Sequence, residues 1–186
     1  MGGAMSLSDW TEGGAEFDVA YRDGTKPTYR RHLWRAKPAD LFGTGAQRRL
    51  GVCMHNPSVA GADPTDNDHT VVKLLGFADR WGFSRVDVAN LGDLIATDHK
   101  EFYAASELLR VSDRCDARIR EIAARADVML VAWGRLDRVW AKDRAREVLA
   151  LIDRPVVCIE KTIHGYPAHP LILRYTAAPV PFEVTP

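Results

Sequence analysis

Long apolar runs and an excess of charge of either sign are missing from this sequence of 186 residues, and cysteine is scarce. A membrane-spanning helix needs about 20 consecutive, mostly apolar residues, so the absence of such a run predicts that the chain does not enter a membrane. Residues 1–5 contain no basic region followed by an apolar stretch, and we expect no secretory signal there. The length suits one domain with a sizeable core.

The three cysteines are Cys53, Cys115 and Cys158, and no two of them form a Cys-x-x-Cys pair. Three thiolates cannot hold a four-cysteine iron–sulfur cluster. Cys53 and Cys158 lie in apolar runs, where a cysteine usually packs as a small hydrophobic residue. We therefore expect a protein of the reducing cytoplasm. We also expect it to use no cofactor and to bind no metal.

Charge is balanced, with 25 lysines and arginines against 25 aspartates and glutamates. A chain without net charge has no overall field that attracts DNA, which counts against a nucleic-acid partner unless basic residues gather locally. One local basic cluster lies near the amino terminus and comprises Arg30, Arg31, Arg35, Arg48 and Arg49.

Four short, nearly continuous apolar runs predict strands over residues 50–55, 86–91, 128–132 and 155–160. Such runs are typical of strands buried on both faces of a parallel sheet. Helical spacing of apolar residues between them predicts helices over about 70–81, from residue 99, over about 112–126 and over about 137–151. The alternation predicts an α/β fold of three layers, α/β/α, around a central, mostly parallel sheet of four strands.

The amino-terminal part of the chain is less regular. Residues 1–27 are rich in glycine and polar side chains, and we expect a loose arm there. Residues 28–35 alternate poorly between apolar and polar side chains, which is compatible with an edge strand. Residues 28–186 are then a single α/β domain.

Polar groups follow all four predicted strands, at the edge of the sheet where α/β proteins bind their ligands. The first strand leads into an ordered loop, Asn56-Pro57-Ser58, and the second ends at Asn90. The third leads into Trp133-Gly134-Arg135, and the fourth into a segment that carries Lys161, His164 and His169-Pro170-Leu171. Each piece has an ordinary structural explanation by itself, but their joint placement at one edge indicates a functional site.

These pieces resemble the ordered motifs of the uracil-DNA glycosylase superfamily. In that family, an Asp-Pro or Asn-Pro loop follows the first strand, an Asn that reads the base follows the second, Trp-Gly follows the third, and His-Pro precedes a Leu. The sequence is also similar, over roughly residues 28–175, to a widespread bacterial family of unknown function marked by a Met-x-Asn-Pro-Ser loop and a His-Pro-Leu ending. The first resemblance implies a glycosylase-like fold. The second gives no information about the activity, because the function of that family is unknown.

The glycosylase resemblance implies that the protein excises a damaged or modified pyrimidine from DNA by hydrolysing an N-glycosidic bond, with the base flipped into a pocket. Asn56 would orient the attacking water or stabilise the sugar, and Asn90 would hydrogen-bond the base edge. His169 would donate a hydrogen bond to the departing base, although His164 is an alternative. Asn cannot act as a general base, so we name Asp66 as the catalytic carboxylate, with Asp63 and Asp93 as further candidates.

Other residues would bind substrate. Pro57, Ser58 and Trp133 would line the pocket with Asn90 and His164. Contacts to DNA phosphates are expected from Arg135, Lys161, Arg30 and Arg31, and Pro170 and Leu171 would shape the loop that enters the duplex. We expect a monomer with no obligatory protein partner.

The sequence departs from the family at Ser58, where efficient uracil enzymes carry an aromatic residue that excludes larger bases. The small residues Ala60, Gly61 and Ala62 follow it. This loss of bulk favours a larger, modified base, such as the hypermodified pyrimidines of phage DNA, and hence a role in phage defence.

Three other interpretations stay open. An enzyme of free nucleosides or nucleotides would use the same pocket and would agree better with the absence of net charge. A nucleic-acid-binding module could have kept the fold without the activity. A metal hydrolase would need His55, His69, Asp66 and Asp68, whose spacing matches no recognisable ligand pattern.

Overall fold

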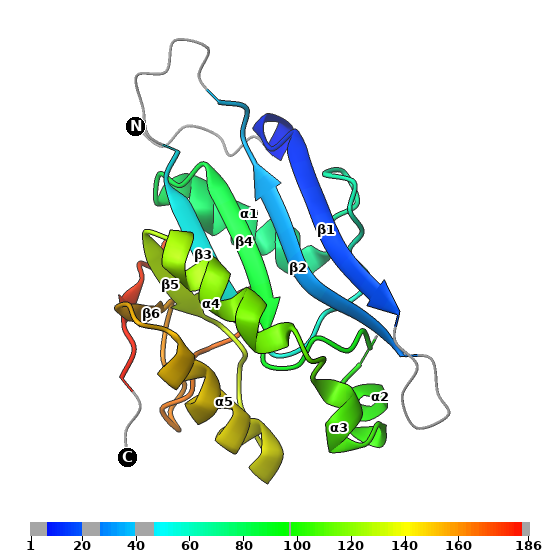
Figure 1. Ribbon diagram of the computed structural model, residues 1–186. Coiled ribbons are helices and arrows are strands. Elements are labelled where there is room, and N and C mark those ends of the chain that lie inside the picture. Colours follow the sequence, from blue (N-terminus) through cyan, green and yellow to red (C-terminus); the bar gives the residue numbers. More distant parts are fainter. Residues whose placement is uncertain (1–6, 20–26, 40–46, 97, 184–186) are drawn as a thin grey trace.

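The computed structural model describes residues 7–19, 27–39, 47–96 and 98–183. Within them lies a mixed seven-stranded sheet with helices on both faces (Figure 1). The strands are β1 Glu12–Val19, β2 Thr28–Ala36, β3 Arg49–Met54, β4 Arg85–Asn90, β5 Val128–Val131, β6 Val156–Cys158 and β7 Val180–Pro181. The helices are η1 Leu7–Asp9, α1 His69–Arg80, α2 His99–Ala104, α3 Glu107–Arg110, α4 Cys115–Arg125, α5 Val139–Leu151 and η2 Pro170–Ile172.

The four strands predicted from apolar runs form the parallel centre of this sheet. The strand order is β1-β2-β4-β3-β5-β6-β7, and the neighbours from β4 to β6 run parallel. The outer pairs, β1 with β2, β2 with β4, and β6 with β7, are antiparallel. The predicted α/β class is therefore confirmed, but the sheet of the described residues has seven strands and not the predicted four.

The amino-terminal segment expected to be a loose arm contributes a strand over Glu12–Val19. It pairs along its whole length with β2, which makes β2 an inner strand and not the predicted edge strand. Gly14 permits this close pairing, because a Cβ there would lie 2.6 Å from Nε1 of Trp34. Glu16 adds an ion pair with Arg118 of α4. Distant partners thus stabilise a strand whose own pattern is weak.

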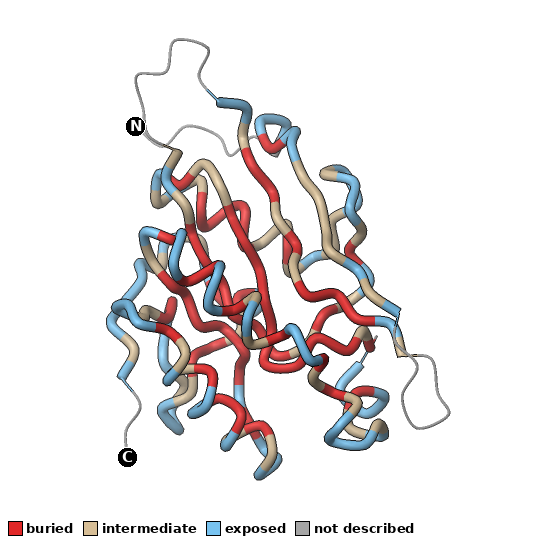
Figure 2. The backbone as a smooth tube through the Cα atoms, in the orientation of Figure 1, coloured by how far each residue is buried: buried red, intermediate tan, exposed pale blue. Residues whose placement is uncertain are grey.

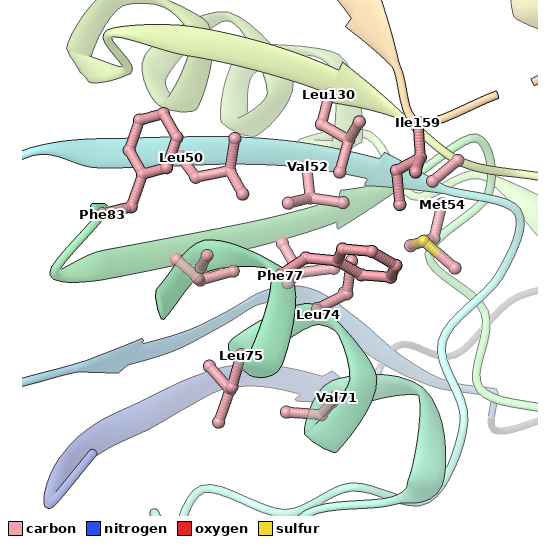
Figure 3. Close-up of a cluster of buried hydrophobic side chains, with 14 of the residues drawn as sticks. Leu50, Val52, Met54, Val71, Leu74, Leu75, Phe77, Phe83, Leu130 and Ile159 are labelled. Carbon is pink, nitrogen blue, oxygen red and sulfur yellow. The ribbon is translucent and has the colours of Figure 1, made fainter. Parts of the chain in front are cut away.

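Helix α1 covers one face of the sheet, and α4 and α5 cover the other (Figure 1). Strands β3, β4 and β5 are buried along most of their length between these layers (Figure 2). Figure 3 shows the core beneath α1, in which Leu74 and Phe77 lie together with Val52 and Met54 of β3. Burial of a large apolar side chain contributes roughly 1.5–3 kcal/mol. Because Met54 is the last residue of β3, this core holds the end of that strand in place.

The ends of α1 follow local sequence rules. The Asp68 carboxylate caps its amino terminus by accepting a hydrogen bond from the Val71 backbone N–H at 2.8 Å. Gly82, with a φ of +73°, follows its last turn, close to the predicted end at about residue 81. Helix α2 begins at residue 99 as predicted, and Asp98 caps it by accepting a hydrogen bond from the Glu101 N–H at 2.8 Å.

The helix predicted over about 112–126 begins later, at Cys115 of α4, and the Ser112 hydroxyl donates to the buried carboxylate of Asp93. In the part of the chain that the structure describes, no helix has both the length and the apolar character needed to span a bilayer.

Candidate active site

A cavity of about 210 Å³ opens at the carboxyl ends of β3 and β4, and we name it the inner cavity. The parallel register sets Met54 beside Asn90, so the residues that follow β3 and those at the end of β4 emerge together. The polar side chains that line the cavity are those of Arg30, His55, Asn56, Ser58, Asp68, Thr70, Asn90, Asp98, His99 and His169. This is the sheet edge at which the sequence predicted a site.

Asn90 is the most deeply placed amide of the inner cavity. Its residue is only 3% exposed, and its side chain makes no hydrogen bond with the described part of the chain. A buried amide without partners is costly unless a ligand or water satisfies it. The Asn90 amide therefore offers one acceptor and two donors to whatever enters the cavity.

Asn56 is held by a chain of hydrogen bonds. Its amide nitrogen donates to the carbonyls of Pro57 at 3.2 Å and Ala96 at 3.1 Å. Its Oδ1 therefore faces Nδ1 of His55 at 3.0 Å, which must carry the proton. Nε2 of His55 in turn accepts from the Tyr103 hydroxyl at 2.8 Å.

Burial lowers the pKa of His55 to about 4, with a further lowering from His99, so the imidazole is neutral near pH 7.

Two opposite charges also line the inner cavity. Arg30 of β2 is 3% exposed, and its Nη1 donates to the carbonyl of Ala60 at 2.6 Å and to that of Ser58 at 3.2 Å. Burial lowers its pKa to about 10, which still leaves the guanidinium charged at pH 7. Asp68 accepts a hydrogen bond from the Ser58 hydroxyl in addition to capping α1.

His169 lines the same cavity from the segment that leads into η2. Its Nδ1 accepts from the Leu171 N–H at 3.4 Å, which leaves the proton of the neutral ring on Nε2. Burial, and then His99, lower the pKa of His169. Gly134, at φ +79°, lies beside it, since a Cβ there would be 3.5 Å from the His169 Cβ.

A second, outer cavity of about 580 Å³ adjoins the first, because His55 and His99 line both. The two imidazoles stack with their centroids 4.4 Å apart. Lys100, Arg135 and Arg138 line the outer cavity together with Tyr103, Ala104 and Asp137. Arg135 pairs with Asp137 at 2.7 Å, so three cations stand against one anion. In a chain without net charge, this is a local basic surface.

The structure brings together many of the residues selected from the sequence. Asn56, Ser58, Asn90, His169, Leu171 and Arg30 line the inner cavity, and Arg135 lines the outer one. Pro57 is buried beside them and supplies a carbonyl to Asn56.

Other selected residues lie elsewhere. Trp133 and His164 line a separate cavity of about 200 Å³, in which Trp133 packs against Phe182. Lys161 is exposed, with its amine 5.6 Å from the Phe182 ring. Asp66 is exposed and does not line the inner cavity.

Arg31 and two further aspartates are also outside the two cavities. Arg31 is buried in ion pairs with Asp18, Glu16 and Asp113, so its charge is already matched. Asp63 is exposed, and burial raises the pKa of Asp93, which is held by Ser112.

Sequence reasoning did not select four residues that line the cavities, His99, Lys100, Tyr103 and Arg138. It named His55 and Asp68 only as possible metal ligands. His55 could have been selected because it directly precedes Asn56 at a strand end. Asp68 has the sequence signature of a helix cap before an apolar helix. That role explains the residue fully, so the sequence gives no reason to expect that it also lines a cavity. Among the described residues, no group of three or more His, Cys, Asp or Glu side chains is arranged to hold a metal ion.

Residues 30–171 match a family described as a protein of unknown function (DUF1643), and the chain belongs to this family. The expected membership of a family of unknown function is thereby confirmed. The matched region begins at Arg30 and ends at Leu171, so it contains every residue that lines the inner and outer cavities. No curated protein and no solved structure matches the chain.

Proposed function

We propose that this protein is a DNA glycosylase that excises a damaged or modified pyrimidine by hydrolysing its N-glycosidic bond. The main support for the proposal is the Asn90 amide, which is buried, lines the inner cavity and makes no side-chain hydrogen bond with the residues that the structure describes. A primary amide presents a donor and an acceptor side by side, which complements the edge of a pyrimidine. A flipped-out base would satisfy the hydrogen bonds that the protein leaves unmade.

The size and charge of the two cavities support a base attached to phosphates over a free nucleoside. At about 210 Å³, the inner cavity is smaller than the roughly 300 Å³ at which pockets for drug-sized ligands begin, and it suits a single base. The adjoining outer cavity carries the cations Lys100, Arg135 and Arg138. These cations suit the phosphates that flank a flipped nucleotide, and the same space would admit a bulky substituent on the base.

Catalysis would use groups that are already oriented. The Asn56 Oδ1 accepts one hydrogen bond from His55 and keeps a second lone pair, with which it can hold a water against the sugar. Nε2–H of His169 makes no hydrogen bond within the described chain and would donate to the base as negative charge develops on it. The resemblance to the uracil-DNA glycosylase superfamily assigns the same roles to these two residues.

Base release tests the proposal. DNA that contains uracil, mismatched thymine, hydroxymethylcytosine or glucosylated hydroxymethylcytosine is incubated with the protein, and alkali-sensitive abasic sites are scored. We expect cleavage of at least one modified DNA, lost in Asn56→Ala and in Asn90→Ala. DNA binding without base release would support an inactive binding module, and release from free nucleosides alone would support a nucleoside enzyme.

A further inference from the structure

Arg30 and Asp68 place opposite charges at one small cavity without neutralising each other by contact. Both line the inner cavity, and both belong to the described residues, yet their side chains form no ion pair with each other. They nevertheless interact electrostatically, as the effect of Asp68 on the Arg30 pKa indicates. Opposite charges that share a buried pocket usually pair directly, so this separation needs a reason.

The Arg30 guanidinium is only partly used by the protein. Nη1 makes both of its hydrogen bonds, to the carbonyls of Ser58 and Ala60, and this half of the group holds the loop after β3. Nε is enclosed and has no partner. Nη2 makes no hydrogen bond with any described residue and is not fully enclosed, which leaves a charged donor for a ligand. A merely structural arginine would be expected to use these donors as well.

The Asp68 carboxylate is held in place by the loop after β3 and by the first turn of α1. The Ser58 hydroxyl and the Val71 N–H each donate to one of its oxygens. The amino terminus of α1, a helix of 12 residues, adds a favourable dipole. Each carboxylate oxygen keeps a further lone pair, because an ionised carboxylate can accept about four hydrogen bonds.

We propose that Arg30 and Asp68 are two further catalytic residues, which stabilise the opposite charges that separate when the N-glycosidic bond breaks. The inference rests on the proposed function. As the bond stretches, the base becomes anionic and the sugar cationic, so a pocket with one fixed cation and one fixed anion is complementary to the transition state. Arg30 faces the base through Nη2, and Asp68 faces the sugar.

The step balances without any further reactant than water. The C1′–N bond breaks, and its electron pair leaves with the base, next to Arg30. The oxygen of a water held by Asn56 forms the new bond to C1′, and one proton of that water passes to Asp68. Asp68 then returns this proton through solvent to the released base, so the products are a free neutral base and an abasic sugar.

Binding of two abasic-site analogues tests the role of Asp68. One DNA carries a pyrrolidine, which is a cation that mimics the sugar in the transition state, and the other carries the neutral tetrahydrofuran. We expect the wild-type protein to prefer the cationic DNA by about tenfold or more, and Asp68→Asn to lose the preference. Asn is as good a helix cap as Asp, so the variant keeps α1 capped. Asp66→Asn is the matched control and should keep the preference.

Rates of base release test Arg30. On whichever DNA of the panel is cleaved, Arg30→Gln should slow single-turnover release by about 10²- to 10³-fold and keep the preference for the pyrrolidine DNA. Arg30→Lys retains the charge and should recover part of the rate, which also controls for the loop contacts. An equal preference for the pyrrolidine in wild type and Asp68→Asn, or full activity of Arg30→Gln, would overturn the inference. Absence of base release by the wild type would instead overturn the proposed function.

Discussion

Nδ1 of His55 lies 3.0 Å from Oδ1 of Asn56, and this contact fixes the orientation of the amide at the candidate active site. The Tyr103 hydroxyl completes the arrangement from the other side of the imidazole, at 2.8 Å from Nε2. Because the neutral ring donates to Asn56 and accepts from Tyr103, protonation of His55 would remove an acceptor that the arrangement needs. The two residues therefore link the chemistry of the site to pH.

The first prediction concerns stability against acid. The pKa of His55 is about 4 in the folded protein, where burial lowers it, and about 6.5 in an unfolded chain. Between these values the unfolded state binds more protons, so the free energy of unfolding should fall as the pH falls from about 6.5 to 4, by up to about 3 kcal/mol. Urea unfolding at several pH values measures this loss. His55→Gln should show a shallower dependence, and an unchanged slope would contradict the assignment.

The second prediction separates the two histidines that the sequence left open. His169 lines the inner cavity, whereas His164 is exposed and lines the cavity of Trp133. His169→Ala should slow base release by about 10²-fold, as loss of one donor to a developing anion does elsewhere. His164→Ala is the control from the same segment and should release the base at the wild-type rate. Comparable losses in both variants would refute this distinction.

The third prediction concerns the outer cavity. If Lys100 and Arg138 contact DNA phosphates, each adds about 0.9 to the slope of log affinity against log salt concentration. The double variant Lys100→Ala, Arg138→Ala should therefore reduce the slope by about 2 and weaken binding to all sequences alike. Fluorescence anisotropy at several salt concentrations measures the slope. Lys161→Ala removes an exposed cation outside both cavities and should leave the slope as it is.

The fourth prediction assigns Asp93 a structural role. Its carboxylate is buried and accepts hydrogen bonds from the Ser112 N–H at 2.7 Å and from the Ser112 hydroxyl. Ser112→Ala removes one of these donors, which should lower the free energy of unfolding by about 1–3 kcal/mol. The same variant should release the base at the wild-type rate. A large loss of catalysis in a stable Ser112→Ala protein would show that Asp93 serves the chemistry after all.

Much of the sheet could be predicted because its inner strands are buried on both faces and read as apolar runs. Strand β1 could not, since its sequence EGGAEFDV carries glycines and acidic residues that favour no strand by themselves. Its partners are distant in the sequence: β2 supplies the backbone pairing, and Arg118 supplies an ion pair. Such long-range stabilisation leaves no local pattern to recognise.

The candidate site, like the sheet, has residues that could be predicted from the sequence and residues that could not. Asn56, Asn90 and His169 could be selected because the topology brings strand ends to one edge. The sequence cannot tell Asp66 from Asp68, since both follow β3 in one irregular loop. The structure distinguishes them through Arg35, whose buried guanidinium donates hydrogen bonds to the carbonyls of Gly61, Asp63 and Asp66 and so anchors the loop. Asp68 is thereby placed at the start of α1 and at the cavity.

The central claim is hydrolysis at the sugar, and the fate of the water oxygen tests it most directly. The cleaved DNA of the panel is treated with the protein in water labelled with heavy oxygen, and the products are weighed by mass spectrometry. We expect an intact, unlabelled free base and one heavy oxygen on the abasic sugar. Label in the base, or no free base from any DNA of the panel, would contradict the account.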